Sequence, residues 1–194
     1  FVGGAAPEFA PHVKGLEIPG YEPRALQTMA LGFAVSSRGA DHNRSGAYEA
    51  DFSEKVDRLH GDESSVPFAI ETEDKAALMD SLILCKFLRG VFVDFFDESA
   101  ELLRAITGWN CDGEELRTIS RRIVTAKKIF NIREGWTHDE DTLPRRFLST
   151  GLKGERVAKL SEDQLQSMIR AYYHERGWNR DGTISNELIQ SLNL

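Results

Sequence analysis

Apolar residues recur at intervals of three and four along most of this chain, and segments with strict alternation are scarce. That spacing places apolar side chains on one face of a helix, whereas a half-buried strand needs a period of two. The fold class is therefore predicted to be mainly α, multi-helical, with little or no sheet. Helices are expected over residues 23–38, 72–88, 98–107, 112–131, 161–177 and 185–192.

Residues typical of helix ends support these boundaries. Pro23 suits the first turn of a helix, and Gly39 suits its end. Ser161 and Gln164 have the spacing of a capping box, in which the serine side chain binds a free backbone N–H of the first turn. Residues 60–70 contain glycine, serine and proline, so we expect an internal connecting loop there.

Composition excludes several classes of protein. A net charge of -7 argues against nucleic acid as a partner, because a general nucleic-acid binder carries a basic surface. The longest apolar run, residues 91–96, contains a charge and is far too short to cross a bilayer, so no membrane partner is expected. The two cysteines, Cys85 and Cys111, cannot build a four-cysteine metal site within this chain. The chain begins at Phe1, and we expect it to be a piece of a longer one.

The residues alone leave the candidate functional groups open. No complete catalytic motif of a common type is present. Cys85 taken alone is more typical of a core residue on an apolar helix face. The polar segment after Gly39 contains His42, which could carry a proton near neutral pH, and Arg44, whose planar fork suits phosphate or carboxylate. A solvated turn explains that segment equally well.

Seven short segments, taken in their order and spacing, are more specific than any one of them alone. Together they resemble the C-terminal domain of the tungsten-dependent aldehyde:ferredoxin oxidoreductase family, and the similarity covers nearly all of residues 1–194. That range would then be one helical C-terminal domain of a larger redox enzyme. The segments are 12–24, 37–44, 80–87, 107–109, 130–135, 141–144 and 172–178.

The resemblance implies roles for the segment that begins at Asp80. The family has a DxxGLC pattern here, and this chain has Asp80 and Cys85 at its ends, Leu84 before the cysteine, and Ile83 in place of the glycine. Asp80 and Leu84 would bind the pterin, with the carboxylate accepting charge-assisted hydrogen bonds from its N–H groups. Cys85 would be a metal ligand, binding an iron of the [4Fe-4S] cluster through its thiolate.

The resemblance also maps His42 and Arg44 onto an HxR segment beside the metal centre. His42 would be catalytic, by binding an oxo ligand or substrate oxygen or by moving a proton. Arg44 would contact the pterin. No family role is implied for Cys111, which we interpret as structural.

The implied activity is the oxidation of an aldehyde to a carboxylic acid at a tungsten (or molybdenum) bis-pyranopterin centre. Electrons would pass through the [4Fe-4S] cluster to ferredoxin. The expected partners are the N-terminal and middle domains of the same enzyme, ferredoxin, the aldehyde and a second copy of the full-length protein, in the cytoplasm. This chain alone would be inactive. The alternatives are a stand-alone helical interaction domain without a cofactor, or a family member that reduces another substrate such as an aromatic thioester.

Overall fold

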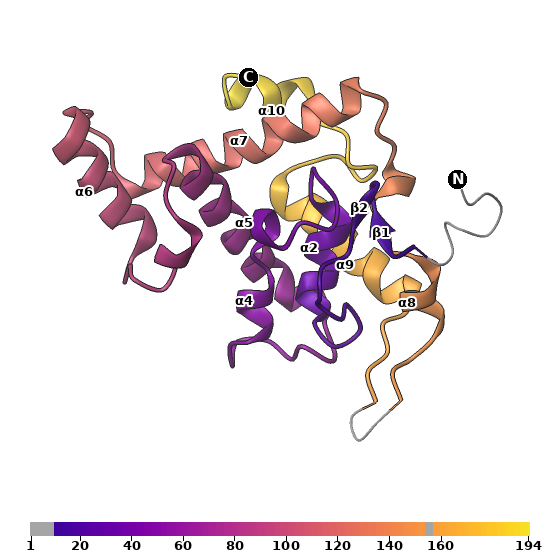
Figure 1. Cartoon of the computed structure of the whole chain (residues 1–194). Helices are drawn as coiled ribbons and strands as arrows, with labels where there is room; N and C mark the ends of the chain where they lie inside the picture. Colours follow the sequence, from indigo (N-terminus) through magenta and orange to yellow (C-terminus); the bar gives the residue numbers. More distant parts are fainter. Residues whose placement is uncertain (1–9, 154–156) are drawn as a thin grey trace.

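The computed structural model describes residues 10–153 and 157–194, and within them the protein is mainly helical (Figure 1). The sheet is a single antiparallel pair, β1 (His12–Val13) with β2 (Leu16–Glu17), in which His12 lies opposite Glu17. The prediction of a mainly α fold with little sheet is confirmed. No helix in the described ranges is long and apolar enough to cross a membrane.

In chain order the α-helices are α2 (Gln27–Val35), α3 (His42–Ser45), α4 (Tyr48–Asp51), α5 (Val66–Ser81), α6 (Phe95–Thr107), α7 (Gly113–Arg133), α8 (Arg145–Ser149), α9 (Glu162–Arg176) and α10 (Asn186–Ser191). Three short 3₁₀ helices are η1 (Glu63–Ser65), η2 (Lys86–Leu88) and η3 (His138–Glu140). Helix α9 begins and ends as predicted, because the Ser161 hydroxyl accepts a hydrogen bond from the Gln164 N–H at 3.2 Å.

Helix α5 is displaced along the chain from its predicted range. The connecting loop expected over 60–70 is shorter than predicted, because η1 and the first turn of α5 occupy its second half. Pro67 lies in that first turn, where its missing N–H needs no partner. At its other end α5 stops at Ser81, seven residues before the predicted end at Leu88. The residues that follow Ser81, Cys85 included, therefore lie outside the helix.

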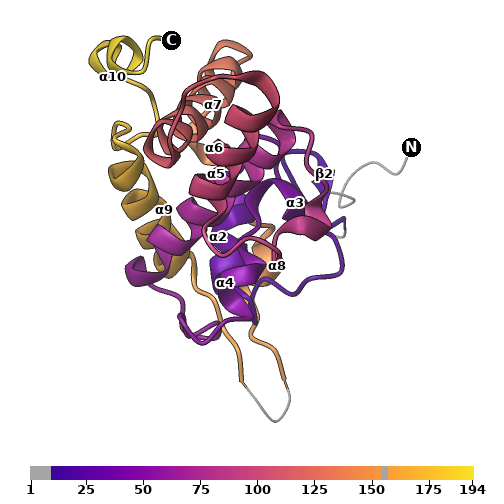
Figure 2. The same ribbon diagram turned by 90° about the vertical axis from the view of Figure 1, so that its left-hand side faces the viewer.

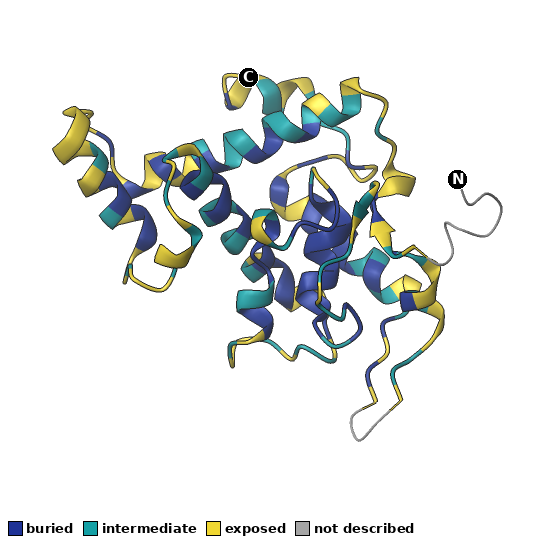
Figure 3. Cartoon of the chain, in the orientation of Figure 1, coloured by how far each residue is buried: buried dark blue, intermediate teal, exposed yellow. Residues whose placement is uncertain are grey.

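Helix α2 forms the centre of the main core. Every residue from Gln27 to Val35 is buried, as expected for a helix that is apolar around its circumference. Its first turn has no cap of its own, and the Asp51 carboxylate of α4 accepts the N–H groups of Thr28 at 3.1 Å and Met29 at 2.8 Å instead. Figure 3 shows this helix almost wholly buried, surrounded by more exposed elements.

A second, smaller core lies where α6 and the first half of α7 extend from the end of α5 (Figures 1 and 2). It contains Cys111, which is only 3% exposed, so the structural interpretation of this residue fits its position. The buried members of this core are Leu78, Met79, Phe95, Phe96, Ala100, Cys111 and Leu116.

Asp141 joins the hairpin, α7 and α9 through a buried charged network. Its carboxylate lies 2.7 Å from the Lys14 amine and 3.0 Å from the Lys128 amine. It also accepts hydrogen bonds from the Trp136 indole at 2.9 Å and the Tyr173 hydroxyl at 2.5 Å. Each oxygen thus has a charged and a neutral donor, which offsets the cost of burying the ions.

Candidate cofactor-binding site

The polar segment after α2 is a short, capped helix and not a loose turn. Gly39 has a φ of +91°, and a Cβ there would collide with the carbonyl oxygen of Val13, so glycine permits a close turn against β1. Asp41 then caps α3 by accepting the N–H of Asn43 at 2.9 Å and of Arg44 at 3.2 Å. The backbone of α3, which carries His42 and Arg44, is therefore held by the tight turn at Gly39 and by the Asp41 cap.

His42 lies at the edge of an aromatic cluster. Its half-buried ring is 5.4 Å from the ring of Tyr21 and 6.2 Å from that of Tyr48, measured between centroids. The Arg89 guanidinium lies 5.1 Å from the Tyr48 ring on the far side of the cluster. Sequence analysis assigned no role to Tyr21, which lies within segment 12–24, or to Tyr48, which lies in none of the seven segments, because only the packing of the chain brings their rings to His42.

Arg44 and Asp80 meet across 36 positions of sequence in an ion pair. The structure thus brings together two of the residues predicted to bind the cofactor. Lys86, which was not predicted, lies 3.2 Å from the other oxygen of Asp80 and also donates to the Ala76 carbonyl at 3.1 Å. Its place directly after Cys85 was the only sequence signal that could have indicated it.

The end of α5 explains the residue pattern between Asp80 and Cys85. The Leu84 N–H bonds to the Met79 carbonyl at 2.8 Å, the Ile83 N–H lies 3.3 Å from the Asp80 carbonyl, and Ile83 has a φ of +57°. This is the Schellman arrangement of a helix end, whose left-handed residue is ordinarily glycine. The glycine of the family pattern is thus accounted for by the helix end itself, and here isoleucine occupies that strained position.

Cys85 is an exposed free thiol in the connection between α5 and η2. The alternative that it lies on an apolar helix face is therefore wrong, because α5 has already ended. Leu84 points the other way, since its half-buried side chain packs on the second core. Within residues 10–153 and 157–194, no hydrogen bond or ion pair joins His42 to the group around Asp80 and Cys85, so the structure brings together only part of the predicted set.

Positive charge gathers around Asp80. Lys127 of α7 is half-buried, and burial, followed by repulsion from Arg44, lowers the pKa of this lysine. Lys86 also lowers that pKa, whereas Asp80 raises it. Arg44, Asp80 and Lys86, contributed by α3, α5 and η2, form one ion-paired group.

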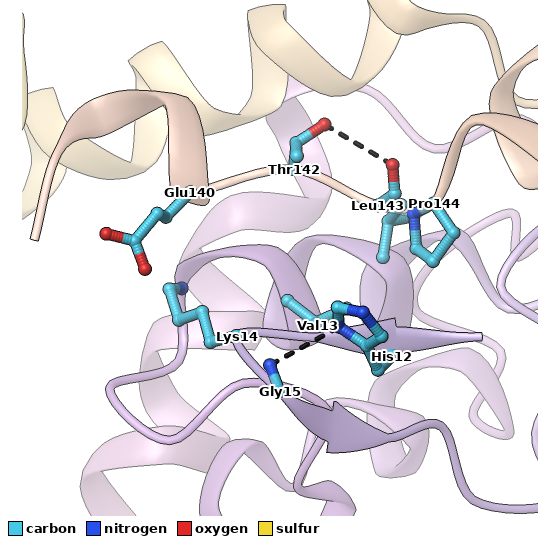
Figure 4. Close-up of a pocket in the computed structure, with 8 residues that line it drawn as sticks. All are labelled: His12, Val13, Lys14, Gly15, Glu140, Thr142, Leu143 and Pro144. Carbon is cyan, nitrogen blue, oxygen red and sulfur yellow. Dashed lines mark hydrogen bonds between the residues drawn. The ribbon is translucent and has the colours of Figure 1, made fainter. Parts of the chain in front are cut away.

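The predicted site residues form no complete metal site within the described residues, and they do not line the surface pocket beside the hairpin. Within residues 10–153 and 157–194, no three His, Cys, Asp or Glu side chains are grouped so that they could hold a metal ion. A pocket of about 460 Å³ lies between the hairpin and the segment after η3, lined among others by His12, Lys14 and Glu140 (Figure 4). None of the predicted site residues lines it.

The fold and site define a class of protein: a helical domain that presents an exposed thiol and an ion-paired carboxylate just after the end of a helix. A family model described as aldehyde ferredoxin oxidoreductase, domains 2 and 3, matches residues 2–194. The chain belongs to the aldehyde ferredoxin oxidoreductase family.

Known relatives agree with that membership, and a solved structure shares the fold. The tungsten-containing aldehyde ferredoxin oxidoreductases of Pyrococcus furiosus and Thermococcus kodakarensis are each 33% identical over 192 residues, which is 97% of this chain and 31% of theirs. The chain thus spans about a third of the length of these relatives. The active-site complex BamBC of benzoyl coenzyme A reductase, solved with 1,5-dienoyl-CoA, shares the fold, with a TM-score of 0.58, 17% identity, and coverage of 92% of this chain and 31% of that one.

Proposed function

We propose that this chain forms one wall of a tungsten (or molybdenum) bis-pyranopterin centre in a cytoplasmic enzyme that oxidises an aldehyde to a carboxylic acid. Electrons leave through a [4Fe-4S] cluster to ferredoxin, and other domains of the same enzyme supply the remaining walls. The observation that carries the proposal is the exposed thiol of Cys85, five residues after an ion-paired Asp80, in a chain of this family.

The two cysteines differ in their fitness as iron ligands. Cys85 is exposed on a connection outside any helix, so its sulfur can reach a cluster held mainly by other parts of the enzyme. Cys111 is buried in the second core and would have to leave it to bind a metal. The donor set of this chain therefore fits one ligand of a four-thiolate cluster.

Asp80 fits the role of pterin acceptor even with its two cationic partners. An ionised carboxylate has about four acceptor positions, and Arg44 and Lys86 use one on each oxygen. The remaining positions can accept N–H groups of a bound pterin, while the two cations hold the carboxylate in place. When bound, the metal–pterin group supplies the two-electron chemistry. His42, on the helix that also carries Arg44, holds or moves a proton at a ring nitrogen.

The test is metal analysis and absorbance spectroscopy on the full-length gene product and two cysteine variants. Cys85→Ser should lose iron and the broad iron–sulfur absorbance, because an alcohol is a poor ligand for iron. Cys111→Ser is the matched control and should keep both, since its sulfur lies in a hydrophobic core. Retention of the full iron content by Cys85→Ser would refute the assignment.

The alternative functions give different results in the same preparation. A colourless, metal-free full-length protein would identify a stand-alone helical interaction domain. A metal-loaded protein that reduces aromatic thioesters and leaves aldehydes unchanged would identify another branch of the family. A substrate screen with both classes of compound separates these outcomes.

A further inference from the structure

The ring of His42 is held by packing and not by a hydrogen bond. In the part of the chain that the structure describes, its ring nitrogens take part in no hydrogen bond or ion pair, and its ring contacts are aromatic. A histidine that moves a proton needs a fixed ring, and a hydrogen bond to one nitrogen ordinarily fixes it. The orientation of this imidazole therefore depends on the rings beside it.

Tyr21 is the nearer of the two tyrosines in contact with His42. The ring centroids are 5.4 Å apart and the ring planes are tilted by 42°, which is within the range of favourable aromatic contacts. Tyr21 lies in the connection between β2 and α2, where its N–H bonds to the Pro19 carbonyl at 2.6 Å. Both rings are half-buried, so this contact restricts the rotation of the imidazole.

Tyr21 is in turn held by Tyr48 of α4. Their rings are stacked, with centroids 5.3 Å apart and planes at 17°. The Arg89 guanidinium lies 5.1 Å from the centroid of the Tyr48 ring and 2.9 Å from the carboxylate of Glu49, the next residue of α4. A continuous set of contacts thus runs from α4 through the two tyrosine rings to the imidazole.

We propose that Tyr21 is a positioning residue: its ring sets the orientation in which the His42 imidazole holds or moves a proton. This inference rests on the proposed function for the role of His42, whereas the ring contact itself does not depend on it. The aromatic ring of Tyr21 carries the effect, because the contact is between the two rings. Tyr21 therefore acts through His42 and not on the substrate.

Aldehyde oxidation by four forms of the full-length enzyme tests the proposal: the unaltered protein, Tyr21→Leu, His42→Asn and the double variant. Tyr21→Leu should lower kcat about tenfold with little change in KM, because misplacing a catalytic group costs up to about 100-fold and Tyr48 still borders the imidazole. In the His42→Asn background the same change should have no further effect on kcat, because a residue that acts only through His42 then has nothing to position.

The chemical reactivity of the imidazole gives a second readout, which needs no bound metal. Diethyl pyrocarbonate modifies accessible imidazole nitrogens, and peptide mass spectrometry of the full-length protein measures the rate at His42. Tyr21→Leu should raise this rate several-fold, because the imidazole loses the ring that restricts it. Tyr21→Phe keeps the ring and loses only the hydroxyl, so it should keep the rate of the unaltered protein.

Phe52→Leu is the matched control, because its ring contacts Tyr48 at 6.4 Å between centroids and is 62% exposed. It should leave kcat and the modification rate unchanged. Tyr48→Leu replaces Tyr21→Leu if that variant fails to fold, and it should change both quantities in the same directions to a smaller extent.

Three results would overturn the role of Tyr21. They are an equal loss of kcat with and without His42, an unchanged modification rate in Tyr21→Leu, and a rate in Tyr21→Phe as high as that in Tyr21→Leu. A full-length protein that oxidises no aldehyde refutes the proposed function instead, and the modification rates then decide whether Tyr21 orients His42.

Discussion

Replacing Ile83 by glycine should stabilise this protein, although the change removes a large apolar side chain. Ile83 ends α5 with a φ of +57°, and a left-handed backbone costs an L-residue roughly 1–2 kcal/mol. Its side chain is 91% exposed, so almost no buried surface is lost with it. Glycine removes the left-handed cost, but its greater freedom in the unfolded chain takes back about 0.5–1 kcal/mol. The expected net gain is about 0.5–1 kcal/mol.

Urea unfolding followed by circular dichroism measures this gain. The midpoint should rise while the slope of the transition stays constant, because the surface exposed on unfolding is nearly the same. The melting temperature should rise by about 1–4 °C for a domain of this size. The loop that carries Cys85 should keep its course, since glycine is the residue that the helix end ordinarily takes.

Ile106→Gly is the matched control for this experiment. Ile106 is 80% exposed, close to the value for Ile83, but it lies in the last turn of α6 with a right-handed backbone. The same chemical change should destabilise the protein there, because glycine is a poor helix former. Opposite changes in stability at the two positions would show that the backbone conformation, and not the loss of the side chain, decides the effect. A lower midpoint for Ile83→Gly, or a shift of both variants in the same direction, would refute the reasoning.

Three further changes test the core. Burial raises the pKa of Asp51 to about 6, so the folded protein keeps a proton that the unfolded chain releases near pH 4. The contribution of Asp51 to stability should therefore fall by up to about 3 kcal/mol as the pH rises from 4 to 6, and the urea midpoint of Asp51→Asn should not show this fall. Gly39→Ala should cost about 2 kcal/mol or more in thermal unfolding, because the new methyl group meets the Val13 carbonyl, and an unchanged midpoint would contradict the placement of β1. Asp141→Asn should cost about 3–5 kcal/mol in urea unfolding by leaving Lys14 and Lys128 without a buried counter-charge, and a loss below 1 kcal/mol would show that these pairs contribute little.

The sequence determined the helices whose signals lie within a few residues of each other. Helix α9 starts and stops where Ser161 and Gly177 indicate, because a capping hydroxyl and a left-handed glycine act on the adjacent turn alone. The ends of α5 were predicted wrongly because no such local signal marks them. Its apolar pattern continues past Ser81, and the Schellman end is formed at Ile83, a residue that gives no local signal for it.

Only the tertiary structure decided which candidate residues meet. The family resemblance singled out Arg44, Asp80 and Cys85, but it did not show that the first two form an ion pair or that the thiol is exposed. Lys86 joins Asp80 because η2 packs against the end of α5, where Lys86 also binds the Ala76 carbonyl. Contacts between such distant positions depend on how whole helices pack, and the burial, charge balance and pKa shifts of a site follow from that packing and not from any short stretch of residues.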